Sequence, residues 1–149
     1  MTAAAGEPVG PTTTVQLLKE MFARMVVAKD ASQLERYYDP GFQLVTNGKT
    51  QDYTDFARGH VEVYRTAIAY AVRYDEQAWV QSEDRAGGRL WITTSRPGEA
   101  ATEIEVVLLA TFVAGRIHRL WELTWPDWSQ LRAFEQYPGS TPAPGGAAG

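Results

Sequence analysis

The sequence has no cysteine, only two histidines and no excess of positive charge. Without cysteine, the chain cannot form disulfides, thiolate nucleophiles or cysteine-ligated zinc sites. Two histidines, His60 and His118, are too few for a site built from several imidazoles, and we expect no metal. The 18 Asp and Glu residues outnumber 14 Lys and Arg, which gives a net charge of −4. Because nucleic-acid binding needs clustered cations, we expect no nucleic-acid partner.

Long hydrophobic runs are also missing. No stretch approaches the roughly 18 apolar residues of a membrane-spanning helix, and residues 1–13 lack the basic start and apolar run of a secretory signal. We therefore expect no membrane association and a cytoplasmic location. Small residues and proline dominate both ends of the chain, a low-complexity composition that cannot pack a core. The sequence predicts one domain over residues 14–136, between disordered tails at 1–13 and 137–149.

The spacing of apolar residues predicts an α+β domain. Helical spacing, with Thr13, Asp30 and Asp52 as candidate N-caps, predicts helices over residues 14–29, through Leu34 and Tyr37, and over 53–67. Alternating apolar and polar residues predict strands over residues 42–46, 70–74, 89–95, 102–113 and 116–125. Turns are expected at Asn47-Gly48 and Ala114-Gly115, and a glycine-containing loop over residues 83–88. Aromatic residues make up 11% of the chain, which indicates a filled core, a lined pocket or an interface.

The last predicted hairpin is the most informative stretch. With Ala114-Gly115 as a two-residue loop, Val107 lies opposite Glu122, and cross-strand partners share a face. One face then holds Glu103, Glu105, Val107, Leu109, Thr111, His118, Leu120, Glu122 and Thr124. The other holds Ile104, Val106, Leu108, Ala110, Phe112, Ile117, Arg119, Trp121, Leu123 and Trp125. We expect the mixed face to border a pocket and the Trp-rich face to meet a second protein surface.

Two further stretches carry a family resemblance: Tyr38-Asp39-Pro40-Gly41-Phe42 and the strand Gly115-Arg116-Ile117-His118-Arg119-Leu120-Trp121-Glu122. They resemble the nuclear transport factor 2-like (NTF2-like) superfamily, which includes the SnoaL-like polyketide cyclases and the ketosteroid isomerases. The resemblance implies a cone-shaped, cystatin-like fold in which three N-terminal helices pack in a strongly curved, mixed sheet. It also implies an apolar pocket at the open end and a homodimer through the outer sheet face.

The resemblance further implies a catalytic carboxylate, because enzymes of the superfamily use pocket carboxylates as acid or base. Glu122 matches the aspartate of the family's His-Trp-Asp strand. Leu120 stands in place of the histidine, and the acid is one methylene longer. The first helix carries no tyrosine to match that of the isomerases, so we do not expect a steroid isomerase.

Candidate site residues follow from the face assignment and the resemblance. As catalytic groups we predict Glu122, His60 and Glu105, the last sharing its face with Glu103. As substrate-binding residues we predict Tyr38, Asn47, Tyr53, Tyr64, Trp91, Leu120 and Thr124. As the dimer interface we predict Ile104, Val106, Leu108, Trp121, Leu123 and Trp125. Structural alternatives stay open: an ion pair of Glu122 with Arg89 or Arg116, and core packing of His60 and the tyrosines.

These residues predict a small-molecule-binding protein that works without a cofactor. The leading hypothesis is an acid/base enzyme of the isomerase, cyclase, dehydratase or epoxide-hydrolase type, acting on an apolar oxygenated substrate. The alternative is a non-catalytic ligand-binding or dimerisation module, because a fold does not fix a function. A third hypothesis is an adaptor that binds a partner protein through the outer Trp-rich face.

Overall fold

The computed structural model describes residues 13–131, which form a mixed α+β arrangement. The helices are α1 (Thr14–Met21), α2 (Leu34–Tyr37) and α3 (Tyr53–Val63). Shorter helical segments are a π-helical continuation of α1 (Phe22–Val27) and two 3-10 turns (Ala31–Gln33 and Trp128–Gln130). The strands are β1 (Tyr38–Thr46), β2 (Lys49–Asp52), β3 (Ala69–Tyr74), β4 (Val80–Gln81), β5 (Arg85–Ser95), β6 (Thr102–Val113) and β7 (Arg116–Trp125).

Side-chain caps fix where the helices begin and end. Thr13 and Gln16 form the predicted capping box, each side chain accepting a hydrogen bond from the other's backbone N–H (3.2 and 3.0 Å). Asp52 caps α3 by accepting from the backbone of Asp55 at 2.9 Å. The helix ends at Val63 rather than near residue 67, because the Thr66 hydroxyl donates to the Val63 carbonyl.

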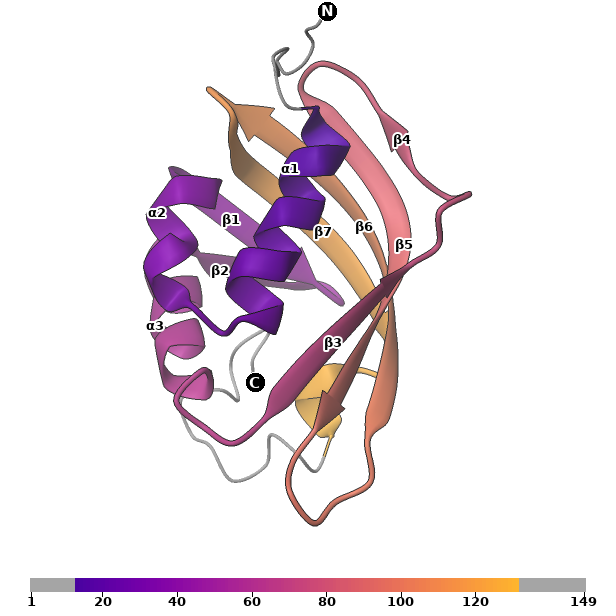
Figure 1. Cartoon of the computed structure of the whole chain (residues 1–149). Coiled ribbons are helices and arrows are strands. Elements are labelled where there is room, and N and C mark those ends of the chain that lie inside the picture. Colours follow the sequence, from indigo (N-terminus) through magenta and orange to yellow (C-terminus); the bar gives the residue numbers. More distant parts are fainter. Residues whose placement is uncertain (1–12, 132–149) are drawn as a thin grey trace, which may run out of the picture.

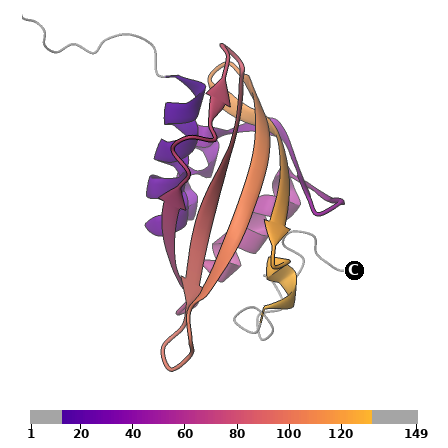
Figure 2. The ribbon, with the colours of Figure 1, turned by 90° about the vertical axis from the view of Figure 1, so that its right-hand side faces the viewer.

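The strands form one sheet in the order β2-β1-β7-β6-β5-β3, with β4 beside β5. Neighbouring strands are antiparallel except β1 and β7, which run parallel. The sheet curves, and α1, α2 and α3 lie on its inner side (Figure 1). Figure 2 presents the outer face of β5, β6 and β7, over which none of these three helices lies.

The predicted glycine loop over residues 83–88 is wrong, because Gly87 and Gly88 lie inside β5. A Cβ atom on Gly88 would lie 2.2 Å from the ring of Trp79. The glycine therefore serves the close approach of an indole ring to the strand, and does not mark a turn.

The hairpin at Ala114-Gly115 has the predicted two-residue loop, but its strands do not keep the predicted faces. Val113 pairs with Arg116 and Phe112 with Ile117, as expected. A bulge at His118 then shifts the register by one residue, so that Leu108, and not Val107, lies opposite Glu122. All later positions of β6 therefore exchange faces relative to β7.

The exchange corrects the predicted roles of the β6 residues. The inner, buried positions of β6 are Ile104, Val106, Leu108, Ala110 and Phe112. The outer positions include Val107 and Leu109, which are exposed together with Trp121, Leu123 and Trp125 of β7. The prediction that Ile104, Val106 and Leu108 form an outer interface is wrong, as is the prediction that Glu103 and Glu105 share a face with Glu122. The alternating apolar residues of β6 instead join the core beneath the helices.

Other predictions concern the chain ends and the membrane. Apart from Thr13, the expected tails at 1–13 and 137–149 lie outside the described residues, as do residues 132–136 of the expected domain. Between residues 13 and 131, no helix has both the length and the apolar character that crossing a membrane requires.

Candidate functional site

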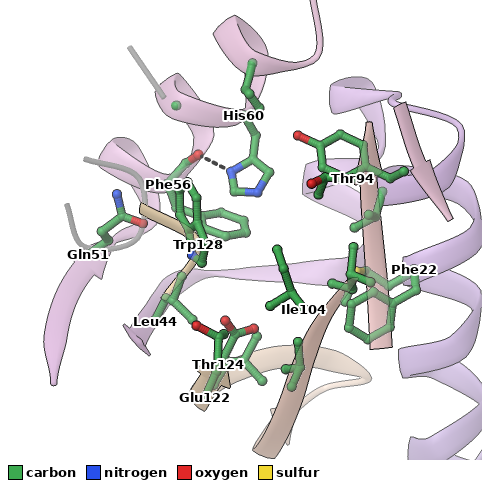
Figure 3. Close-up of a pocket in the computed structure, with 18 of the residues that line it drawn as sticks. Phe22, Leu44, Gln51, Phe56, His60, Thr94, Ile104, Glu122, Thr124 and Trp128 are labelled. Atoms are coloured by element: carbon green, nitrogen blue, oxygen red, sulfur yellow. Dashed lines mark hydrogen bonds between the residues drawn. The ribbon is translucent and has the colours of Figure 1, made fainter. Parts of the chain in front are cut away.

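A cavity of about 140 Å³ lies between the inner face of the sheet and the helices. Its walls are mostly apolar, and a few polar side chains interrupt them, among them Glu122, His60, Tyr64 and Thr94. In Figure 3, His60 projects into the cavity from α3 on one side, and Glu122 and Thr124 lie on β7 on the opposite side. Small-molecule sites have this composition: apolar walls with a small number of polar groups that orient the ligand.

Glu122 is the acidic residue among the described residues that line the cavity. It projects from the inner face of β7 and accepts a hydrogen bond from the Thr46 hydroxyl at 3.2 Å. Burial raises the pKa of the Glu122 carboxyl from its ordinary value of 4.5 to about 7, and the Thr46 hydrogen bond offsets part of that rise. Near neutral pH, the carboxyl can therefore both accept and donate a proton.

Asn47 fixes the strand that carries Glu122. Its side chain donates to the Thr124 hydroxyl (2.8 Å) and accepts from the Thr124 backbone N–H (2.9 Å). Its own backbone N–H donates to the Glu122 carbonyl at 3.0 Å. Asn47 and Gly48 both have positive φ (50° and 85°) in the two-residue turn between β1 and β2. The turn therefore clamps β7 from the side, and Asn47 positions the site without lining the cavity.

His60 lines the cavity as a neutral ring. Its Nδ1 lies 2.9 Å from the Phe56 carbonyl, one helical turn earlier (Figure 3). Because a carbonyl only accepts, Nδ1 carries the hydrogen and Nε2 keeps a lone pair. Burial lowers the pKa of the imidazole from 6.5 to about 4, against a smaller opposite effect of the Phe56 hydrogen bond. The neutral ring offers an acceptor to the cavity and is not a proton donor at neutral pH.

An aromatic row forms one side of the cavity. Successive ring centroids are 4.9 Å apart for Tyr38 and Phe56, 4.1 Å for Phe56 and His60, 5.4 Å for His60 and Tyr64, and 6.1 Å for Tyr64 and Tyr70. The spacing of residues 56, 60 and 64 places three of these rings on one face of α3 and its C-cap. Neighbouring rings in this row are tilted or edge-to-face, with interplanar angles from 39° to 86°, and the row faces branched aliphatic side chains of the sheet.

Two hydroxyl groups on the cavity wall are buried and unpaired. The Tyr64 hydroxyl and the Thr94 Oγ1 have no hydrogen-bond partner among residues 13–131. Burial, with the neighbouring Tyr38 and Tyr70, raises the pKa of the Tyr64 hydroxyl well above its usual range, so it stays protonated. Thr94 was missed as a candidate residue, although the alternation Leu90, Ile92, Thr94 along β5 indicates an inward position.

The structure brings six of the predicted site residues to the cavity wall: Tyr38, His60, Tyr64, Leu120, Glu122 and Thr124. Ile104 and Val106, predicted for the interface, also line it, and Leu108 is buried in the core. Neither of the ion pairs considered for Glu122 forms. Arg89 contacts Asp75 and Glu105 (3.7 and 3.3 Å), and Arg116 donates to the Glu35 carbonyl (3.2 Å).

Besides Asn47, three further predicted site residues lie away from the cavity wall: Glu105, Trp91 and Tyr53. Glu105 is on the outer face beside Arg89, because the bulge turned it there, and it cannot act with Glu122. Trp91 is also on the outer face, where the guanidinium groups of Arg73 and Arg89 stack on its ring at 4.0 and 4.6 Å. Tyr53 packs against the core at the start of α3. No group of three or more His, Asp or Glu residues within residues 13–131 is arranged to hold a metal ion.

Comparison with known proteins shows the fold. No family model and no curated protein matches this sequence. PrhC from Penicillium brasilianum is similar in structure with a TM-score of 0.62 and 12% identity, over 74% of this chain and 78% of that one. A SnoaL-like polyketide cyclase from Agrobacterium tumefaciens has a TM-score of 0.59 and 12% identity, over 75% and 91% of the two chains. An NTF2-like protein of unknown function from Cytophaga hutchinsonii has a TM-score of 0.55 and 14% identity, over 78% and 94%. The chain therefore has the NTF2-like fold that its sequence resembles.

Proposed function

We propose that the protein is a cofactor-free acid/base enzyme that acts on a small, apolar, oxygenated molecule, with Glu122 as the group that moves the proton. The observation that carries this proposal is a carboxyl group on an apolar cavity with a pKa raised to about 7. Acid/base catalysis is most efficient when the pKa of the group lies near the working pH, because both forms are then populated. The fold shared with a SnoaL-like polyketide cyclase supports a small-molecule substrate.

The catalytic cycle needs only a proton that leaves one atom and returns to another. The Glu122 carboxylate accepts a proton from the substrate or from a water beside it. The carboxylic acid so formed then returns a proton to a different atom, which restores the enzyme. Isomerisation, cyclisation, dehydration and epoxide opening all fit this scheme. The Thr46 hydrogen bond and the Asn47 clamp hold the carboxyl in place during both steps.

Two other residues of the cavity wall, Tyr38 and His60, complement this role. Burial and the nearby Glu122 raise the pKa of the Tyr38 hydroxyl far above its usual range, so Tyr38 is a hydrogen-bond donor at any working pH. Such a donor stabilises negative charge that develops on a substrate oxygen while Glu122 removes a proton. His60 is neutral, so we assign its Nε2 as an acceptor that orients a substrate hydroxyl, and not as the acid.

The test is Glu122→Gln, with Glu105→Gln on the outer face as the matched control. Enolisable ketones, β-hydroxyketones and epoxides of one ring or less are incubated with each protein in deuterated buffer and followed by NMR. We expect the wild type to promote deuterium uptake or product formation, and Glu122→Gln to slow it by about 10²–10⁴-fold. Glu105→Gln should keep the wild-type rate, since its side chain lies on the other face of the sheet.

The same experiment distinguishes the proposed enzyme from the alternative, a non-catalytic ligand-binding module. If wild type and Glu122→Gln bind members of the panel equally and neither promotes exchange or conversion, the protein is a ligand-binding module and the enzyme proposal fails. Equal loss of activity in Glu105→Gln would likewise contradict the assignment of Glu122.

A homodimer is the second part of the proposal, with a corrected interface. The outer face exposes an apolar patch made of Val107, Leu109, Trp121, Leu123 and Trp125. Beside it, Arg73 and Arg89 are already paired with Glu103 and Glu105 of the same chain, at 2.9 and 3.3 Å. A face that is apolar with its flanking charges neutralised suits an equally apolar partner, and a second copy of the same patch supplies one.

A further inference from the structure

One part of the cavity wall comes from the turn that follows the sheet. β7 ends at Trp125, and a 3-10 turn (Trp128–Gln130) comes after it. The Asp127 carboxylate caps this turn by accepting hydrogen bonds from the backbone N–H and the hydroxyl of Ser129, at 3.0 and 2.8 Å. Trp128, the first residue of the turn, lines the cavity. The chain therefore leaves the sheet and places one indole ring on the cavity wall.

Trp128 connects the end of β7 to the C-terminal end of α3. Its side chain packs against the buried residues Val63, the last residue of α3, and Ile68, which precedes β3. It also packs against the core beneath the helices. In Figure 1, the turn lies at the end of the sheet where α3 ends and β3 begins. Trp128 is only partly buried, so it stands between the cavity and the surface at this end.

Trp128 differs from the other large side chains on the cavity wall. Phe22, Tyr38 and Phe56 are 4% exposed or less and belong to the buried core, where they hold the helices on the sheet. Trp128 has the largest side chain among the described lining residues, and it lies outside the sheet and α1, α2 and α3. Its replacement therefore enlarges the cavity without removing a side chain from the buried core.

The volume of the cavity limits the size of its occupant. The cavity measures about 140 Å³, and an apolar cavity of about 150 Å³ holds one benzene molecule. Sites for drug-sized ligands begin at about 300 Å³. An indole is itself a fused pair of rings, so its removal adds room for roughly one further ring, less the space that neighbouring side chains take up by collapsing.

We propose that Trp128 is a specificity-determining residue: it limits the substrate to an uncharged molecule of about one ring, and a smaller side chain at this position admits two fused rings. This inference rests on the proposed function for the small-molecule site itself. The charge limit follows from the walls, because no Lys or Arg among the described lining residues compensates an anionic ligand. The indole of Trp128 is only a hydrogen-bond donor and transfers no proton, so it selects by size.

The test compares the binding of two ketones to the full chain by calorimetry and ligand-observed NMR. Cyclohexanone has one ring, and 1-decalone has two fused rings and the same carbonyl group. We expect the wild type to bind cyclohexanone at least about 5-fold tighter, because the second ring of 1-decalone does not fit. In Trp128→Ala the preference should reverse, with 1-decalone at least about 5-fold tighter, because the second ring then buries additional apolar surface.

Trp91→Ala is the matched control. It also replaces a partly buried tryptophan by alanine, but Trp91 lies on the outer face of the sheet and should leave the wild-type preference unchanged. Trp128→Phe removes only part of the indole and should give an intermediate ratio of the two Kd values. If Trp128→Ala does not fold, Trp128→Leu decides the test, because leucine keeps an apolar contact with Val63, Ile68 and the core.

Four results overturn the inference. They are no binding of cyclohexanone, a wild type that binds 1-decalone as tightly or more tightly, a preference that is the same in wild type and the folded Trp128 variants, and a reversal that Trp91→Ala also produces. Failure of the proposed function has a different signature. The preference for ring size then reverses in Trp128→Ala as expected, but Glu122→Gln promotes deuterium uptake into cyclohexanone as fast as the wild type, or neither protein promotes it.

Discussion

The two faces of β6 and β7 place the same residue types in opposite environments. On the inner face Leu108 is 1% exposed and packs in the core, whereas on the outer face its neighbour Leu109 is 59% exposed. Glu122 lies on the inner face in an apolar cavity, and Glu105 lies on the outer face beside Arg89. The difference shows that function on this sheet follows from which face a strand position lies on. One bulged residue, His118, decides this for β6 from Thr102 to Thr111 relative to β7.

The face also decides what a carboxyl group can do. Burial raises the pKa of Glu122 to about 7, which suits proton transfer at neutral pH. Glu105 has a guanidinium partner at 3.3 Å and contacts water, so its place is in a surface ion pair. Of the three glutamates that the sequence places on one face, Glu103, Glu105 and Glu122, only Glu122 lies where a bound small molecule would reach it.

The largest expected effect is a difference in the free energy of unfolding between substitutions on the inner and outer faces of β6. Leu108→Ala should lower the free energy of unfolding by about 2–5 kcal/mol, because it opens a void in a buried layer. Leu109→Ala should change it by about 0.5 kcal/mol or less. Urea unfolding followed by tryptophan fluorescence measures both, at several protein concentrations so that self-association is recognised by its concentration dependence. Equal losses in the two variants would contradict the register that the bulge imposes.

That register marks the limit of what the sequence could predict about the fold. The helix caps, the hairpin turns at Asn47-Gly48 and Ala114-Gly115, and the strand ends of β6 and β7 all follow from local residue patterns. The bulge at His118 does not, because it depends on how β7 must bend to run parallel to β1 as well as antiparallel to β6. Alternation along β6 alone indicates that one of its faces is entirely apolar. Pairing β6 with a β7 that has no bulge assigns this apolar face to the outer side of the sheet, which is the wrong side.

The site was predictable to a similar extent. The apolar stripe of α3 and the resemblance of β7 placed His60 and Glu122 at the cavity. Thr94 was not predicted, because a threonine in a strand gives no sequence signal of a functional role. Only the structure shows that its hydroxyl lacks a hydrogen-bond partner among the described residues. Trp91 was expected in the pocket as a large aromatic residue, but it lies on the outer face because its neighbours Leu90 and Ile92 on β5 point inward. There it packs against Arg73 and Arg89.

A second prediction uses the pH dependence of stability. The folded-state pKa of Glu122, about 7, is above its ordinary 4.5, so the folded protein holds the extra proton between these values. Stability therefore falls as pH rises through this window, by about 3 kcal/mol. The pKa of His60 is lowered from 6.5 to about 4, so the unfolded chain holds the extra proton and stability falls as pH drops through that window. Between pH 4.5 and 6.5 the two contributions oppose each other.

Single substitutions should expose each contribution. Relative to wild type, Glu122→Gln should become more stable as pH rises from 4.5 to 7, by about 3 kcal/mol over the window. His60→Gln should show the opposite trend and gain stability relative to wild type as pH falls from 6.5 to 4. Denaturant unfolding across this pH range measures both differences. A pH-independent difference for Glu122→Gln would show that its carboxyl is not held in the apolar setting described above.

A third prediction concerns the outer apolar patch as a self-association surface. Trp125 is 76% exposed, and exposed tryptophans are frequent hot spots of interfaces. Trp125→Ser should weaken the proposed homodimer by about 2 kcal/mol, or roughly 30-fold in Kd, without changing ligand binding in the cavity. Val80→Ser, an exposed apolar residue on β4, is the control. Sedimentation at several concentrations measures both, and a wild type that stays monomeric throughout would turn attention to a different partner protein.

The smallest expected effect lies in the charged flank of the outer face. Arg73 contacts Glu103 at 2.9 Å and stacks on Trp91 at 4.0 Å. Arg73→Gln should cost about 1 kcal/mol or less, because the pair is exposed, and only the ion-pair part should fade as salt is added. Arg58→Gln breaks the 2.7 Å contact with Asp55 on α3, and no aromatic ring within residues 13–131 stacks on the Arg58 guanidinium. Its effect should therefore be lost almost entirely in salt. The salt-resistant remainder of Arg73→Gln then measures the ring contact. If no remainder is found, the stack on Trp91 contributes nothing, and the flank confines the apolar patch by charge alone.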